Sequence, residues 1–94
     1  MRTQKSYVFR LYVAGTSDRS TRALLNAREI LDVHLHDRYT LDVIDIFQQP
    51  ALARRDQILA VPTLVKTAPP PVRRFIGDLS DRDVVLDGLD LKRK

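Results

Sequence analysis

The tetrapeptide Val61-Pro62-Thr63-Leu64 restricts the fold of this chain more than any other short segment. Proline has no backbone N–H and a fixed φ angle, so within a sheet it stands at the first residue of a strand or on an edge. The β-branched and apolar residues after Pro62 therefore predict a strand that opens at Thr63. The 94-residue chain contains no cysteine, which excludes disulfides, thiolate metal sites and thiol nucleophiles.

The length and composition indicate one small globular unit. We expect a single domain over residues 1–94 with a core from about 7 to 91, because a chain of this length supports one core and is only marginally stable alone. No apolar run reaches the length of a membrane span, and the polar residues 1–6 contain no signal-peptide core. We therefore expect a cytoplasmic protein.

Periodic hydrophobic patterns predict four strands and three helices. Residues 7–13 are apolar on both alternating faces, which is typical of a central strand covered on both sides. From about 19 to 35, apolar residues recur every three or four positions and predict an amphipathic helix. Ser80 and Asp83 resemble a capping box at the start of a last helix. The apolar residues expected on that helix are Val84, Val85, Leu86 and Leu89. The other elements are expected as strands over 39–46, 63–66 and 72–76 and a short helix over 50–57.

The predicted element order is βαβαββα in a mixed α/β domain. A right-handed βαβ unit followed by a hairpin and a helix is the topology of thioredoxin-like domains. In those domains an apolar-Pro-Thr step like the one at Pro62 forms one wall of the active site. Because this chain has no thiols to use that wall, binding of another protein is the simplest use of the frame.

Three segments resemble the KaiB family of circadian-clock proteins, and the resemblance extends over nearly the whole chain. These segments are residues 11–15 (LYVAG), 59–64 (LAVPTL) and 69–80 (PPPVRRFIGDLS). The resemblance implies a protein without catalytic activity or cofactor that binds the clock ATPase KaiC and modulates its phosphorylation and ATPase cycle. It also implies KaiA or a KaiC-binding histidine kinase as further partners.

The resemblance further implies two folds for one sequence. One is a self-associated ground state, a dimer or tetramer with the order βαββααβ, and the other is the thioredoxin-like monomer that binds KaiC. Two packings of one chain can differ by only a few kcal/mol. Gly88 and Asp90 lie in the family's switch region, where Gly weakens a helix by about 1 kcal/mol and Asp opposes the helix dipole. Pro62, Pro70 and Pro71 are further candidates for fold choice, because an X-Pro bond can adopt either isomer.

Basic residues are the candidates for partner contact. The formal net charge of +4 suits an acidic partner. We predict contacts from Lys66, Arg73 and Arg74, because Arg pairs bidentately with carboxylates and all three follow the proline-led step. Arg22 on the first helix is a weaker candidate of the same type. A solvated strand face is the competing interpretation of these residues.

The chain departs from the family pattern at Asp42 and Gln57, where relatives commonly carry Lys, so contacts at these positions are not carried over. A KaiB-like stress or signalling adaptor that binds another protein is the main alternative function. Nucleic-acid binding would use Arg73 and Arg74 with Phe75 as a stacking group, but strand alternation places Phe75 on the core side. A glutathione-binding domain would need a second helical domain, for which 94 residues leave no room.

No metal site is expected. His34 and His36 are two residues apart, so they point in different directions on a helix, and neither has an acidic or His companion at metal-ligand spacing. The chain also lacks a Gly-rich phosphate loop.

Overall fold

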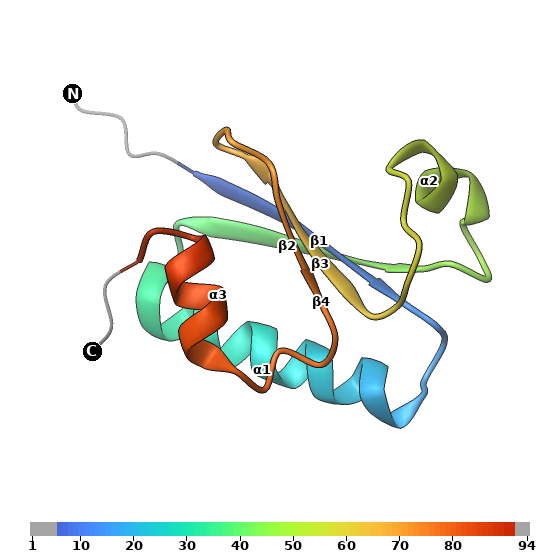
Figure 1. The fold of residues 1–94 in the computed structure, drawn as a ribbon, viewed down its shortest axis with the longest axis horizontal. Coiled ribbons are helices and arrows are strands. Elements are labelled where there is room, and N and C mark those ends of the chain that lie inside the picture. The colour runs from blue at the N-terminus through green and yellow to red at the C-terminus, as the bar shows by residue number, and fades with distance from the viewer. Residues whose placement is uncertain (1–5, 92–94) are drawn as a thin grey trace.

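The computed structural model describes residues 6–91, and the predicted order βαβαββα is confirmed (Figure 1). The elements are β1 (Tyr7–Val13), α1 (Asp18–Leu35), β2 (Tyr39–Asp45), α2 (Pro50–Arg55), β3 (Thr63–Ala68), β4 (Arg73–Ile76) and α3 (Arg82–Gly88). Within this described part, no helix has the length and apolar character that a membrane span requires.

The four strands form one sheet in the order β2-β1-β3-β4. β1 runs parallel to β2, and α1 connects the two as the crossover of a βαβ unit. β3 is antiparallel to both β1 and β4. β1 is therefore an inner strand, as its apolar sequence predicts.

The two faces of the sheet are covered to different extents. Helices α1 and α3 lie together on one side, and α2 lies apart from them (Figure 1). The larger core joins Phe9, Leu11 and Val13 of β1 to residues of α1 and α3. The opposite face has a small cluster around Tyr12, with Ile44 and Val65 from the neighbouring strands. The expectation that β1 is covered on both sides thus holds for its carboxyl half, because the preceding residues on the second face are only half-buried.

The start of α3 differs from the sequence-based prediction. Asp81 is the N-cap, and its Oδ1 accepts a hydrogen bond from the Val84 amide at 3.3 Å. The Ser80 amide instead donates to Asp78 Oδ1 at 3.1 Å, so the capping box predicted at Ser80 is wrong. Val84 was expected in the apolar face but is 57% exposed. The core takes its contacts from Val85, Leu86 and Leu89, and Val84 lies outside that stripe.

Candidate protein-binding surface

The two neighbouring arginines of β4 point to opposite faces of the sheet and reach different helices. Arg73 Nε donates to the Gly88 carbonyl at the end of α3, at 3.3 Å. Arg74 Nη1 donates to the Gln57 carbonyl after α2 at 3.1 Å, and its Nη2 donates to the Asp56 carbonyl. A guanidinium at a helix carboxyl end satisfies orphan carbonyls and complements the negative end of the helix dipole. Each arginine therefore caps one helix.

Lys66 lies directly opposite Arg73 in the β3–β4 ladder, and Arg22 lies on α1. Lys66 is only 5% exposed, and its Nζ lies 5.9 Å from the centre of the Tyr7 ring, a cation–π distance. Arg22 on α1 is exposed, with its Nε 3.5 Å from Asp78 Oδ2. The structure does not gather the four basic residues into one patch. Their roles in partner contact stay predictions.

The segment after α2 is fixed to the sheet by the carboxylate of Asp56. Arg10 Nη1 donates to Asp56 Oδ2 at 2.9 Å, and the hydroxyl of the fully buried Tyr12 donates to the same oxygen. Burial by itself raises the pKa of the Asp56 carboxyl, but the hydrogen bonds from Tyr12 and Arg10 outweigh it and hold this pKa below its ordinary value. Burial and the bond to Asp56 raise the pKa of Tyr12. Asp56 is therefore a carboxylate at neutral pH, and Tyr12 is its neutral donor.

The backbone reverses direction directly after α2. The Gln57 amide donates to the Arg54 carbonyl at 3.1 Å, and the Ile58 amide donates to the Ala53 carbonyl at 2.9 Å. This pair of bonds, with φ +56° at Gln57, is a Schellman motif. The turn directs the chain toward Leu59 and the proline-led strand.

An apolar groove lies where this turn meets the end of β2. Its volume is about 110 Å³, and its lining consists of Ile46, Ala53, Ile58, Leu59, Ala60 and Val61. Leu59 is 97% exposed, and Phe47, next to the groove residue Ile46, is 72% exposed. Arg54 and Arg55 are exposed on the adjoining helix. We call Phe47, Arg54, Arg55 and Leu59, with the groove, the α2 surface.

Sequence reasoning missed the α2 surface. Its signal is Leu59, a large apolar residue between the short helix and the proline-led strand, outside any periodic pattern. Periodicity identifies residues that a helix or strand buries, so it says nothing about an apolar side chain in a connecting segment. Grouped exposed apolar side chains beside charged ones are typical of protein-binding sites.

The residues predicted to govern fold choice lie at the end of α3 and around the prolines. A Cβ on Gly88 would overlap Cε1 and Cζ of Phe75, so the ring would have to move to admit a side chain there, and no special φ angle is involved. Phe75 is buried at 8% exposure, which confirms its predicted core position and removes it as a base-stacking group. Asp90 has φ +58°, the left-handed region that favours glycine.

The end of α3 repeats the backbone pattern of α2. The Asp90 amide donates to the Asp87 carbonyl at 3.2 Å, and the Leu91 amide donates to the Leu86 carbonyl at 2.9 Å. Leu91 packs against the large core. This end is a second Schellman motif, with Asp90 at the left-handed position.

Pro62 directly precedes β3, as the sequence predicts. The Val61-Pro62 bond is cis, and the Thr63 hydroxyl donates to the Ala60 carbonyl at 2.6 Å, which closes the turn before β3. Pro70 and Pro71, joined by a cis bond, lie in the exposed connection between β3 and β4. The structure does not test a role of these prolines in fold choice.

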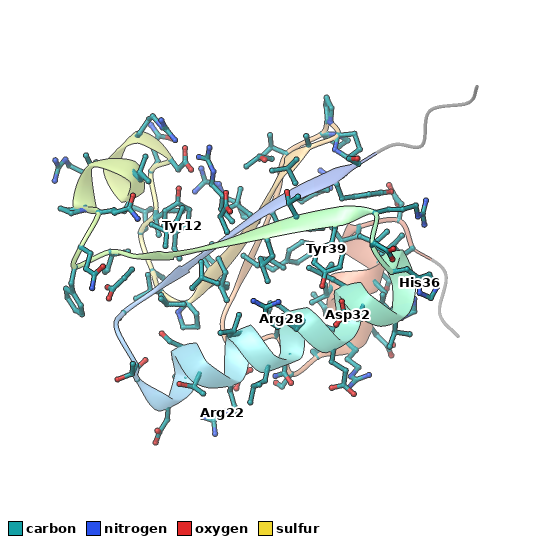
Figure 2. All side chains as sticks on the ribbon, turned by 180° about the vertical axis from the view of Figure 1, so that it is seen from behind. Tyr12, Arg22, Arg28, Asp32, His36 and Tyr39 are labelled. Atoms are coloured by element: carbon teal, nitrogen blue, oxygen red, sulfur yellow. The ribbon has the colours of Figure 1, made fainter. Side chains whose placement is uncertain are left out.

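A second polar group of residues lies far from α2, where α1 ends and β2 begins (Figure 2). The Tyr39 hydroxyl donates to Asp32 Oδ1, and burial, followed by this bond, raises the pKa of Tyr39 to about 12. Arg28 and His36 line the same open depression. Within residues 6–91, no group of three His, Cys, Asp or Glu side chains could hold a metal ion together.

Comparisons with known proteins identify relatives of this chain. A family model described as KaiB domain matches residues 10–91. The circadian clock oscillator protein KaiB of Prochlorococcus marinus strain MIT 9312 is 57% identical over 91 residues, which cover 97% of this chain and 87% of that protein. The protein of the same name from Synechococcus sp. strain RCC307 is 56% identical, over 97% of this chain and 83% of that protein.

Two solved structures share the fold at low sequence identity. The N-terminal domain of Synechococcus elongatus SasA has a TM-score of 0.77 at 23% identity, with 96% of this chain and 89% of that chain covered. Mitochondrial thioredoxin 3 of Saccharomyces cerevisiae has a TM-score of 0.73 at 15% identity, with 94% and 81% covered. The predicted thioredoxin-like fold is confirmed.

Proposed function

Because the chain belongs to the KaiB family, we propose that it is a circadian-clock component that acts by binding a KaiC-type ATPase and catalyses no reaction itself. Support comes from relatives that carry the name circadian clock oscillator protein and match 97% of this chain. The absence of cysteine removes the thiol chemistry for which a thioredoxin-like frame is otherwise suited. The proposed role is to modulate the phosphorylation and ATPase cycle of the partner.

The observation that carries this proposal is the exposure of the α2 surface. Leu59 and Phe47 are 97% and 72% exposed, although burying such side chains stabilises a contact by about 1.5–3 kcal/mol each. Arg54 and Arg55 are exposed on α2 itself and suit a partner that carries carboxylates. A buried apolar anchor with a charged rim is the usual anatomy of a protein interface.

We assign partner binding to the thioredoxin-like fold and a resting role to a self-associated βαββααβ arrangement. If the binding fold is a minor state, the apparent affinity falls by its fractional population, and complex formation is slow. Slow association then makes the chain a delay element in the partner's cycle.

Mixing experiments with the KaiC-type ATPase of the same organism test the proposal. Complex formation is followed over hours by size exclusion with light scattering, in ADP and in a non-hydrolysable ATP analogue. We expect slow, nucleotide-dependent binding. Leu59→Ser should weaken it by roughly tenfold or more, as for a central apolar anchor. Leu25→Ser is the matched control, because Leu25 is 63% exposed on α1, away from the α2 surface.

Absence of binding in both nucleotides would overturn the KaiC assignment. Equal losses in Leu59→Ser and Leu25→Ser would overturn the assignment to the α2 surface. A pull-down would then test the alternative of a stress or signalling adaptor with another protein partner. A steep loss of affinity with salt for any DNA or RNA would instead indicate nucleic-acid binding.

A further inference from the structure

Helix α2 has little that holds it in place by itself. It has six residues, and none of them is buried. A helix this short is not stable in isolation, because one or two turns do not repay the cost of nucleation. Its apolar contacts are with the small cluster on the second face of the sheet, through half-buried Leu52 and Ala53, and Ile58 after the helix packs against the same cluster. The position of the α2 surface therefore depends on further contacts.

Those contacts are made by one residue, Asp56, which is the C-cap of α2. Its side chain accepts from Arg10 and Tyr12 of β1, and its carbonyl accepts from Arg74 of β4. The contacts thus join the end of α2 to two strands on either side of β3. Tyr12 is fully buried in the sheet, so its hydroxyl cannot follow the segment if the segment moves away.

The negative charge of Asp56 also lies among three positively charged guanidinium groups. Arg10 Nη1 lies 2.9 Å from Oδ2, and Arg55 Nε lies 3.7 Å from Oδ1. Arg74 reaches the carbonyl of the same residue. Without the negative charge, three guanidinium groups repel one another, and an amide in its place offers one oxygen instead of two to Arg10, Arg55 and the buried Tyr12 hydroxyl.

From this convergence we infer that Asp56 is a positioning residue, which holds the α2 surface in the orientation that a protein partner recognises without itself needing to touch that partner. The inference rests on the proposed function for the identity of the partner, but not for the positioning itself. Asp56, Tyr12 and Arg10 then contribute to partner binding indirectly, because they position Leu59 and the groove.

Asp56→Asn gives this inference a test in which two explanations predict opposite signs. Removing one negative charge beside Arg54 and Arg55 should strengthen binding to an acidic partner if only charge matters. Loss of positioning should weaken it. We expect affinity to fall by roughly tenfold, and amide hydrogen exchange over residues 50–60 to accelerate by about tenfold or more, as for a locally opened segment. Asp37→Asn is the charge-matched control on the turn after α1.

Hydrogen exchange of the free chain needs no partner, so it decides the positioning even if the proposed KaiC-type partner does not bind. Unchanged exchange over residues 50–60 would overturn the inference. Faster exchange with equal or tighter binding would overturn the functional part of it. Tyr12→Phe removes a single hydrogen bond to Asp56 and keeps the charge, so it should change exchange and affinity in the same direction by a smaller amount. It also keeps the test decisive if Asp56→Asn fails to fold.

Discussion

Helices α2 and α3 end in the same way on the backbone and are held in different ways by their side chains. Both finish in a Schellman motif with a non-glycine residue at the left-handed position, Gln57 with φ +56° and Asp90 with φ +58°. One arginine of β4 reaches each end, Arg74 for α2 and Arg73 for α3. The two ends lie on opposite faces of one sheet.

Charged and polar groups hold the end of α2, whereas apolar packing holds the end of α3. Asp56 gathers Arg10, Tyr12 and Arg74 at α2. At α3, Gly88 lies against the Phe75 ring and Leu89 enters the large core. The polar contacts of Asp56 fix the end of α2 while Leu59 beyond it stays exposed, whereas the apolar contacts at the end of α3 belong to the packed core. The α2 end is therefore suited to binding, and the α3 end is suited to maintaining this fold.

The largest expected change in stability concerns the end of α3, which apolar packing holds. Gly88→Ala should destabilise the described fold by about 1–2 kcal/mol, because displacing the Phe75 ring costs more than the roughly 1 kcal/mol that Ala gains in a helix. Urea denaturation measures the free energy of unfolding, and NMR populations report any second fold. In the Phe75→Leu background the same Gly88→Ala change should be neutral or stabilising. Equal effects of Gly88→Ala in both backgrounds would show that the ring contact does not govern this end.

The two arginines offer a direct comparison of the ends. Arg74→Gln should lower the free energy of unfolding by about 1 kcal/mol, since it loses two carbonyl acceptors, and Arg73→Gln by about 0.5 kcal/mol, since it loses one. Hydrogen exchange should accelerate around Ile58 in the first variant and around Leu89 in the second. Exchange that rises at both ends in either variant would show that the two ends are not independent.

The last comparison of the two ends concerns the left-handed residues themselves. Gln57→Gly and Asp90→Gly should each stabilise the described fold by about 0.5–1 kcal/mol, because glycine adopts positive φ without steric cost. The gain should be larger at Gln57, since Asp tolerates the left-handed region better than Gln. Thermal denaturation compares the two variants. A larger gain at Asp90 would mean that its charge at the negative end of the α3 dipole outweighs the backbone cost.

Hydrophobic periodicity predicts much of the fold. The strand over 7–13 and the helix up to Leu35 match their observed bounds within one residue at each end. The prediction fails at the start of α3, where Ser80 and Asp81 are both acceptable caps and the backbone path after β4 selects Asp81. Basic character selected Arg73 and Arg74 as candidates for partner contact, and that role stays a prediction. Residue type alone could not show that each arginine is bonded to a helix end within its own chain.

The sequence by itself determined the order of elements, the proline-led entry into β3, the absence of thiol chemistry and the core position of Phe75. These follow from patterns between near neighbours in the chain, because strand alternation and helix periodicity are local. Only the tertiary structure decided that Asp56 meets Arg10 and Tyr12, that Gly88 lies against the Phe75 ring, and that Leu59 remains exposed. Such contacts join residues far apart in sequence, and their geometry depends on how the sheet and the helices pack together.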